Sequence, residues 1–417
     1  MPHDSLAAEF SNAMRSLRDS DAEYVPQVVD LLLRKARDFR ASDVHLVPQQ
    51  TGLKMQLRID GVLHHVITFD GDICPRIVAR LKVLAGLLTY RTDVPQEGRI
   101  ANSRSDAEQL AGEVRVTTFP TLFGEKAAVR LFADSDHYQR LNKLGLPDDI
   151  EAAMGNLLQA TSGVILLTGP SGSGKTTTVY ACLRELVRLH GDGKGLMSLE
   201  DPIEVVVPGV TQSQVRPHVG FDLATGIKSM MRQDPDVIMI GEIRDPETAE
   251  CAFQAALTGH LVLTTFHAGS AVEAVTRLLD MGIEPYLINS TLRAVVCQRL
   301  FRKICPDCFN QPTTDISPAG IQKPTGSADN SATVEVPAIR CRTCGDIRYH
   351  GRFVTAELLN PNRTEISQAL LERVDANRLE SIAKECGTVT LHDRAREAVR
   401  TGLTYPEEAF RVLGRSV

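Results

Sequence analysis

The residues from Gly169 to Thr176 could bind phosphate, because they follow the spacing GxxxxGK[ST] at every defined position. Such a loop directs backbone N–H groups and the positive end of the following helix dipole toward phosphate oxygens. We expect Lys175 to reach the β- and γ-phosphates of a nucleotide and the Thr176 hydroxyl to bind Mg²⁺. An ordinary turn rich in Gly and Ser is the alternative. The predicted nucleotide-binding residues are Gly169, Pro170, Ser171, Gly172, Ser173, Gly174, Lys175, Thr176 and Thr177.

The segments on either side of this loop have the periodicity that a phosphate-binding loop needs. Residues 164–168 form a short apolar run, which predicts a buried strand. Residues 177–189 repeat apolar side chains at helical spacing, on a face formed by Val179, Leu183, Leu186 and Val187. The sequence therefore predicts a strand, a Gly-rich turn and a helix N-terminus in succession, and it indicates that the chain binds a nucleoside triphosphate.

Acidic residues in two later segments could complete a site for hydrolysis, which needs Mg²⁺ coordination and an oriented water molecule. Glu242 follows the apolar run 237–240, so we expect it at the carboxyl end of a strand, where a P-loop fold places an acid that acts on the metal and its water. Residues 198–204 hold three carboxylates within five residues, and a solvated acidic turn is the alternative for this cluster. His260 and His267 flank a further apolar run, and each is alternatively a hydrogen-bonded structural residue.

Four cysteines form two CxxC pairs, Cys305 with Cys308 and Cys341 with Cys344, separated by 32 residues. Four thiolates suit a structural Zn²⁺ in tetrahedral geometry and leave no open catalytic position. The intervening stretch is rich in Pro, Thr, Ser, Gly and Asn, so a metal would stabilise a segment that cannot build much core of its own. A redox pair, an iron–sulfur cluster and unrelated buried cysteines are the alternatives.

The overall composition is that of a soluble globular protein, with 43% hydrophobic and 24% charged residues. The net charge of −6 and the lack of a dense Lys/Arg run argue against nucleic acid as the main partner. Residues 301–352 hold seven Lys or Arg and five Asp or Glu, so four thiolates and one Zn²⁺ would leave this segment almost without net charge. The sequence contains no apolar stretch near 18 residues and no secretory signal, so we expect a cytosolic chain.

We expect six consecutive parts in an α/β protein of this length. Helical spacing from Val25 onward, short alternating segments and a strand pair joined around residues 123–124 predict a small α+β domain. A polar stretch follows and is interpreted as a linker, and the apolar runs after it predict a mostly parallel sheet. The predicted parts are a polar segment 1–24, an α+β domain 25–136, a linker 137–149, a P-loop domain 150–300, a tetracysteine element 301–352 and a helical C-terminal domain 353–417.

Taken together, these motifs resemble those of one family, the hexameric secretion ATPases of type II secretion and type IV pilus assembly (GspE/PilB-type). The resemblance runs from about residue 25 to the C-terminus. It rests on the family's aspartate box, atypical Walker B region, histidine box and tetracysteine element, and on motifs of its N-terminal domain. The matching segments are 41–45, 57–61, 95–99, 199–204, 232–236, 241–245, 258–260 with His267, 298–300, and 349–352 with 357–358. The resemblance implies a RecA-like P-loop domain preceded by a PAS-like N-terminal domain.

The resemblance also implies roles for individual residues. Glu204 would activate or orient the attacking water, and Glu242 would act through Mg²⁺ and its water shell. His267 would help to sense the γ-phosphate or the neighbouring subunit, and His260 is a weaker candidate for this role. The family's N-terminal domain offers arginines to the nucleotide as arginine fingers, with surface or strand-pair arginines as the alternative. The matching positions are Arg99, Arg115 and Arg130.

By the same resemblance, the chain would be an ATP-hydrolysing motor that works as a homohexamer at the cytoplasmic face of the bacterial inner membrane. It would act on a polytopic platform protein and power assembly of a type IV pilus or a type II secretion pseudopilus, with ATP, Mg²⁺ and structural Zn²⁺. A pilus-retraction ATPase is one alternative, although such relatives generally lack the tetracysteine element. A DNA-stimulated RecA-like motor and a nucleotide-binding regulator without turnover are the others. Only 24 residues precede the first matched helix, so we expect the docking that larger members make through an extra N-terminal domain to be absent or made differently.

Overall fold

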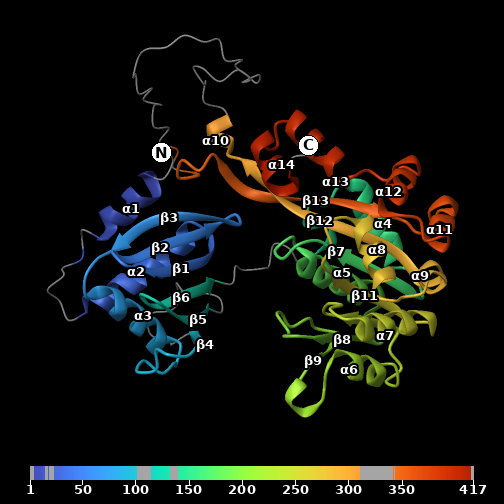
Figure 1. Ribbon diagram of the computed structural model, residues 1–417, viewed down its shortest axis with the longest axis horizontal. Helices are drawn as coiled ribbons and strands as arrows, with labels where there is room; N and C mark the ends of the chain where they lie inside the picture. The colour runs from blue at the N-terminus through green and yellow to red at the C-terminus, as the bar shows by residue number, and fades with distance from the viewer. Residues whose placement is uncertain are drawn as a thin grey trace, which may run out of the picture. The chain divides into compact units, whose positions relative to one another are not determined.

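The computed structural model describes residues 4–14, 17, 23–100, 114–131, 140–309, 341 and 343–414 (Figure 1). The chain divides into two compact units, of which the first holds Met1–Asp134 with Lys303–Gly351 and the second holds Ser135–Arg302 with Arg352–Val417. Each unit has its own sheet and its own apolar core. This grouping differs from the predicted parts, because nearly all of the range 301–352 belongs to the first unit and the range 353–417 belongs to the second.

The first unit is built on a six-stranded sheet in the order β3-β2-β1-β6-β5-β4, in which every neighbouring pair is antiparallel. Its elements are α1 (Asp4–Met14), α2 (Tyr24–Asp38), β1 (Ala41–Gln49), β2 (Gly52–Ile59), β3 (Val62–Phe69), α3 (Ile73–Leu84), β4 (Gln96–Ile100), β5 (Val114–Thr121), β6 (Gly124–Leu131) and α10 (Pro306–Phe309). Alternate strand residues and one stripe of each of α2 and α3 form a common core. Asp60 and Gly61 have φ of 47° and 85°, as a two-residue hairpin turn between β2 and β3 requires. These elements confirm the predicted α+β domain, while its likeness to a PAS domain stays a prediction.

Helix α1 lies within the predicted polar segment 1–24 and docks on the core of the first unit. Its Leu6 and Phe10 are 2% and 0% exposed and belong to the core of the first unit. The Phe10 ring packs edge-on against Phe69 of β3, with ring centroids 6.4 Å apart. Two large apolar side chains at i and i+4 are enough to dock one face of a helix on an existing core, but so short a pattern is hard to recognise in a polar stretch.

The second unit is built on a seven-stranded sheet in the order β13-β12-β7-β11-β10-β8-β9. Its strands are β7 (Gly163–Thr168), β8 (Leu196–Glu200), β9 (Thr211–Gln214), β10 (Val237–Ile240), β11 (Leu261–Phe266), β12 (Leu292–Ile304) and β13 (Tyr349–Leu359). Its α-helices are α4 (Asp148–Leu157), α5 (Lys175–His190), α6 (Leu223–Met230), α7 (Pro246–Leu257), α8 (Ala271–Asp280), α9 (Pro285–Thr291), α11 (Thr364–Leu371), α12 (Ala376–Glu385), α13 (Leu391–Arg400) and α14 (Pro406–Leu413). All neighbouring pairs from β12 to β9 are parallel, which confirms the predicted mostly parallel sheet.

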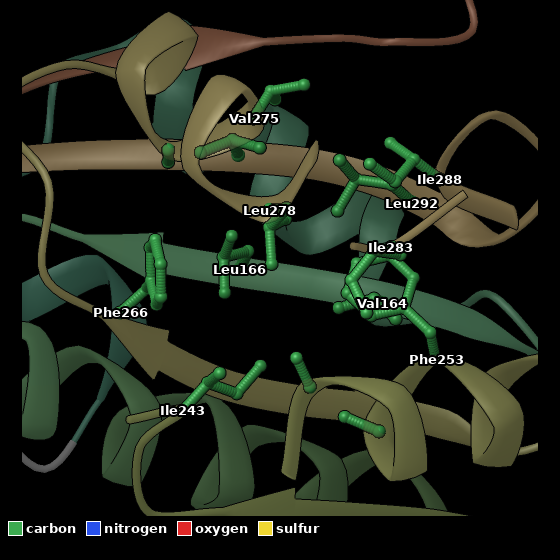
Figure 2. Close-up of a cluster of buried hydrophobic side chains, with 14 of the residues drawn as sticks. Val164, Leu166, Ile243, Phe253, Phe266, Val275, Leu278, Ile283, Ile288 and Leu292 are labelled. Carbon is green, nitrogen blue, oxygen red and sulfur yellow. The ribbon is translucent and has the colours of Figure 1, made fainter. Parts of the chain in front are cut away.

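Strand β7, which leads into the phosphate-binding loop, is buried at every residue, as its apolar run predicts. Val164 and Leu166 belong to one apolar cluster, and the alternating Ile165 and Leu167 belong to another, so helices cover both faces of the sheet. Figure 2 shows part of the first cluster, in which Val164 and Leu166 lie among side chains of neighbouring helices such as Leu278 of α8. The strand that positions the loop is therefore fixed from both sides.

The helical tail and part of the predicted linker pack into the second unit. Helices α11 and α12 bury apolar side chains in the same cluster as Val164. Leu141 and Leu146 are buried in the other cluster, although both fall within the predicted linker 137–149. Residues 137–139 of that range lie outside the described residues. Among the helices that the structure describes, none has both the length and the apolar character to span a membrane.

Candidate functional site

The predicted phosphate-binding loop connects the end of β7 to helix α5 (Figure 1). At Gly169, φ is +142°, and a Cβ atom there would lie 2.5 Å from the Gln298 carbonyl oxygen and 2.6 Å from Ser173 Oγ. At Gly174, directly before the helix, φ is +94°, in the region that favours glycine. The turn from strand to helix therefore needs glycine at these two positions. The first N–H groups of α5 have no partner within the helix, and this turn directs them toward the loop.

The side chain of Lys175 is 8% exposed and reaches back over this loop. Its Nζ donates hydrogen bonds to the carbonyl oxygens of Gly169 at 2.8 Å and of Pro170 at 3.1 Å. Burial lowers the pKa of Lys175, while the negative charge of Glu242 opposes that shift. The two residues predicted to act on the phosphates and on the metal are thus within electrostatic reach of each other. Thr176, the predicted Mg²⁺ ligand, follows Lys175 in the first turn of α5 and is partly exposed.

Glu242 and His267 meet at the carboxyl edge of the sheet. Glu242 follows β10 and His267 follows β11, which are neighbouring parallel strands. His267 Nε2 lies 3.1 Å from Glu242 Oε2, and the other oxygen of Glu242 pairs with Arg244. Arg244 Nη1 also lies 3.5 Å from a carboxylate oxygen of Asp201, which follows the next strand, β8. Three adjacent strands thus bring alternating acidic and basic groups to one edge.

The three carboxylates of the acidic segment after Ser198 lie in different surroundings. Glu200, the last residue of β8, is 3% exposed, Asp201 belongs to the charged edge just described, and Glu204 is exposed on the loop that follows. The carboxylate of Glu200 accepts hydrogen bonds from the side chains of Tyr180, Ser198 and Gln212. The segment is therefore more than a solvated acidic turn, because one of its carboxylates is buried and hydrogen-bonded.

His260 makes local contacts in the turn between α7 and β11. Its Nδ1 lies 2.8 Å from the Ala255 carbonyl oxygen and 3.2 Å from Thr258 Oγ1. These contacts agree with the structural alternative for this histidine. Of the two predicted histidines, the structure brings only His267 to Glu242.

The three predicted arginine fingers form a row on the sheet of the first unit. Arg99 of β4 is directly opposite Arg115 of β5, and Arg115 is directly opposite Arg130 of β6. Arg115 Nε lies 3.3 Å from a carboxylate oxygen of Glu97, and Arg130 Nε lies 3.2 Å from one of Asp43. These two acids offset part of the repulsion between like charges on neighbouring strands. The row belongs to the first unit and the phosphate-binding loop to the second, so a role as arginine fingers stays a prediction.

The four predicted zinc ligands come together in the first unit. The Sγ atoms of Cys305, Cys308, Cys341 and Cys344 all lie within 4.8 Å of one another. Sγ of Cys305 is 3.7 Å from that of Cys341, and Sγ of Cys308 is 3.5 Å from that of Cys344. Four thiolates at about 2.3 Å from a tetrahedral Zn²⁺ are about 3.8 Å from one another. The cluster therefore has the dimensions of a site for one structural ion, and these cysteines are not unrelated core residues.

Comparison with known proteins places the chain in a family. The sequence model of the type II/IV secretion system proteins matches residues 18–411. The chain belongs to this family. This secretion system protein is 37% identical over 415 residues to the type II secretion system ATPase E of Vibrio cholerae. This alignment covers 99% of the chain and 80% of the relative. It is 35% identical over 396 residues to the type IV pilus assembly ATPase TfpB of Acinetobacter baylyi. This alignment covers 95% of the chain and 66% of the relative.

Two solved structures share the fold of this type II/IV secretion system protein. The ATPase DotB of Legionella pneumophila aligns with a TM-score of 0.63 and 20% identity over 94% of this chain and 97% of that one. The pilus retraction motor PilT with bound ADP aligns with a TM-score of 0.58 and 24% identity over 92% of this chain and 96% of that one. These likenesses confirm the predicted α/β fold, and the family confirms the predicted resemblance and the prediction of an ATPase.

Three polar residues that support the site in this secretion ATPase were not predicted from its sequence. Arg244 pairs with Glu242. Its position two residues after Glu242 in the same motif could have indicated this pairing. Arg299 of β12 is 8% exposed and donates a hydrogen bond to the Gly269 carbonyl oxygen at 2.5 Å, two residues beyond His267. Tyr180 lies on the buried face of α5, where its hydroxyl was the only sign that it does more than fill the core.

Proposed function

We propose that this secretion ATPase is a homohexameric motor that powers assembly of a type IV pilus or a type II secretion pseudopilus by ATP hydrolysis. The observation that carries the proposal is that the phosphate-binding loop, His267 and Glu242 follow the carboxyl ends of three neighbouring parallel strands, β7, β11 and β10, and that His267 contacts Glu242. Open α/β sheets bind ligands at that edge. The names of two relatives, a type II secretion ATPase and a type IV pilus assembly ATPase, support the choice of machine.

In this proposal the loop 169–174 and Lys175 bind the phosphates of ATP. The N-terminus of α5 supplies N–H donors and Lys175 supplies a buried ammonium, which together suit a polyanion. The Thr176 hydroxyl would hold Mg²⁺, which prefers oxygen ligands and phosphate oxygens in nucleotide sites. When bound, the ion neutralises charge on the β- and γ-phosphates.

The residues at the sheet edge and on the loop after β8 would carry out hydrolysis. Glu242 would act through Mg²⁺ and its water shell, and His267, which is paired with Glu242, would help to sense the γ-phosphate or the neighbouring subunit. Glu204 orients the attacking water as a general base. The arginine row would neutralise phosphate charge when nucleotide is bound, through Arg99, Arg115 and Arg130.

We place the motor at the cytoplasmic face of the bacterial inner membrane, bound peripherally through its partners. A polytopic platform protein of the pilus or secretion machine would receive the mechanical work. Assembly is favoured over retraction by the tetracysteine cluster and by the 35% identity to a pilus assembly ATPase. Nucleic acid is not an expected partner, because the net charge is −6 and the tetracysteine segment would be almost neutral with zinc bound.

A structural Zn²⁺ held by the four cysteines is also part of this proposal. Cys305→Ser or Cys341→Ser is expected to release the ion and to destabilise the segment around residues 300–352, because a structural site needs all four ligands. Nucleotide binding in the second unit should persist. The measurement is the metal content of the purified variants, followed by nucleotide binding.

Cys386→Ser is the matched control, since Cys386 is a free cysteine outside the cluster and partly exposed. It should keep the zinc content of the parent chain. The zinc assignment fails when both cluster variants hold as much zinc as the control.

The proposed function is tested by ATP turnover of the purified chain with and without single-stranded or duplex DNA. Slow hydrolysis that is indifferent to both kinds of DNA is expected, because the net charge is −6 and the sequence has no dense run of Lys and Arg for a nucleic-acid backbone. Strong stimulation by DNA would favour the RecA-like motor instead.

A further inference from the structure

The loop after β8, which presents Glu204, is held by a tyrosine of the nucleotide-binding helix. Tyr180 lies on α5 and is 3% exposed. Its hydroxyl oxygen accepts a hydrogen bond from the backbone N–H of Glu204 at 3.1 Å and a longer one from that of Val205 at 3.4 Å. The same helix that begins at Lys175 therefore also fixes the main chain of the proposed water-orienting residue.

Glu200 keeps this tyrosine hydroxyl in one orientation. The hydroxyl donates to Glu200 Oε2, while Glu200 Oε1 accepts from Ser198 Oγ at 2.5 Å and from Gln212 Nε2 at 2.9 Å. Burial, with the neighbouring Glu200 carboxylate, holds the pKa of Tyr180 well above its usual range, so the phenol stays protonated. Because its hydrogen points to Glu200, the lone pairs of the oxygen are available to the two N–H groups of the loop.

Gln212 of β9 fixes the part of the loop that follows Glu204. Its Oε1 accepts from the backbone N–H of Val207 at 2.6 Å, and its Nε2 donates to the Val205 carbonyl oxygen at 3.0 Å. Hydrogen bonds from the partly buried Gln212 side chain thus fix the main chain of this part of the loop. The exposed Glu204 side chain sits on a main chain that Tyr180 holds at Glu204 itself and that Gln212 holds at the residues directly after it, which suits a residue that must orient a water molecule.

We propose that Tyr180 is a positioning residue for ATP hydrolysis, which transmits the position of the P-loop helix to the Glu204 loop through its hydroxyl group. This inference rests on the proposed role of Glu204. It does not give Tyr180 any contact with the nucleotide. It predicts that loss of the hydroxyl changes the rate of hydrolysis and the opening of the loop, but leaves nucleotide affinity intact.

The test compares Tyr180→Phe with Tyr286→Phe, which removes a hydroxyl from an exposed tyrosine on α9 (62% exposed). Two quantities are measured in the full chain: kcat and KM for ATP, and the hydrogen exchange of the backbone amides of Glu204 and Val205. Tyr180→Phe should lower kcat about tenfold or more with KM nearly unchanged, since small misplacements of a catalytic group have effects of that size. Exchange of the two amides should become about fivefold faster, the ratio that corresponds to one hydrogen bond of about 1 kcal/mol.

The exchange measurement does not depend on ATP turnover, so it separates this inference from the proposed function. A parent chain without turnover contradicts the proposed function, while faster exchange in Tyr180→Phe still supports the positioning contact. Unchanged exchange overturns the inference, as does faster exchange with unchanged kcat. Parallel losses in kcat, in nucleotide affinity and in melting temperature would also overturn it, because they indicate a merely structural role. Glu200→Gln, which alters the anchor of the hydroxyl, should reproduce the fall in kcat at unchanged KM.

Discussion

Glu204→Gln is expected to bind ATP with nearly the affinity of the parent chain and to hydrolyse it about 10²- to 10⁴-fold more slowly. Glutamine keeps the size of the side chain but offers no carboxylate to align the attacking water or take its proton. Glu204 contacts the Tyr180 hydroxyl through its backbone N–H and not through its side chain. The substitution should therefore leave this contact and the position of the loop unchanged. Single-turnover hydrolysis and equilibrium binding of ATP, measured together, separate the two effects.

Glu250→Gln is the matched control, because Glu250 is an exposed residue of α7 and the substitution makes the same change of charge. This control should hydrolyse ATP at the rate of the parent chain. Near-normal turnover by Glu204→Gln would move the water-orienting role to another carboxylate of the edge, and Asp201 and Glu242 would be tested next.

Glu408→Gln is expected to lower the free energy of unfolding by about 3–5 kcal/mol, the usual cost of removing one partner from a buried ion pair. Glu408 lies on α14 and is 0% exposed. Its carboxylate accepts hydrogen bonds from the backbone N–H, Nε and Nη2 of Arg302 at 3.0, 3.0 and 2.7 Å, and two more from Arg411. A glutamine amide has one acceptor oxygen where the carboxylate has two, and it brings no charge to balance Arg302 at the end of β12.

The same ion pair predicts a pH dependence of stability. Burial alone would raise the pKa of Glu408, but hydrogen bonds from Arg411 and Arg302 outweigh it and lower the pKa from 4.5 to about 2. A carboxyl with a lower pKa in the folded state stabilises the fold above its unfolded pKa, and this contribution is lost as the pH falls from about 4.5 toward about 2. Glu408→Gln should therefore lose less stability on acidification than the parent chain.

Denaturant unfolding at neutral and at acidic pH measures both effects of Glu408→Gln. Glu407→Gln is the control, because Glu407 is the preceding residue on the same helix and is exposed. Equal stability of the two variants at neutral pH would show that the Glu408–Arg302 pair contributes no net free energy to folding.

The phosphate-binding loop could be predicted from the sequence because its determinants are local. Glycine at 169 and 174, an apolar strand before them and a helical stripe after them all lie within about one strand–turn–helix unit. The meeting of Glu242 and His267 was also predictable in outline, since each follows an apolar run that forms a parallel strand. Their 3.1 Å contact depends on β10 and β11 being neighbours, which the sequence pattern alone does not specify.

Contacts between residues far apart in the sequence could not be predicted. The backbone N–H of Gly351 donates to Asp60 Oδ2 at 2.9 Å across 291 residues, and contacts of this kind join the tetracysteine segment to the first unit. The surroundings of the carboxylates in the acidic segment 198–204 could not be predicted either, because composition does not distinguish the buried Glu200 from the exposed Glu204. In the structure, the side chains of Tyr180, Ser198 and Gln212 donate to the Glu200 carboxylate, whereas Glu204 contacts Tyr180 through its backbone N–H.

The central claim is that this chain hydrolyses ATP at its phosphate-binding loop. ATP turnover by the parent chain and by Lys175→Ala tests this claim most directly. Lys143→Ala is the control, since Lys143 is an exposed lysine of the same unit. We predict slow hydrolysis by the parent chain and the control, and a loss of at least about 100-fold in Lys175→Ala, which lacks the ammonium that binds the β- and γ-phosphates. Hydrolysis that persists in Lys175→Ala would contradict the account.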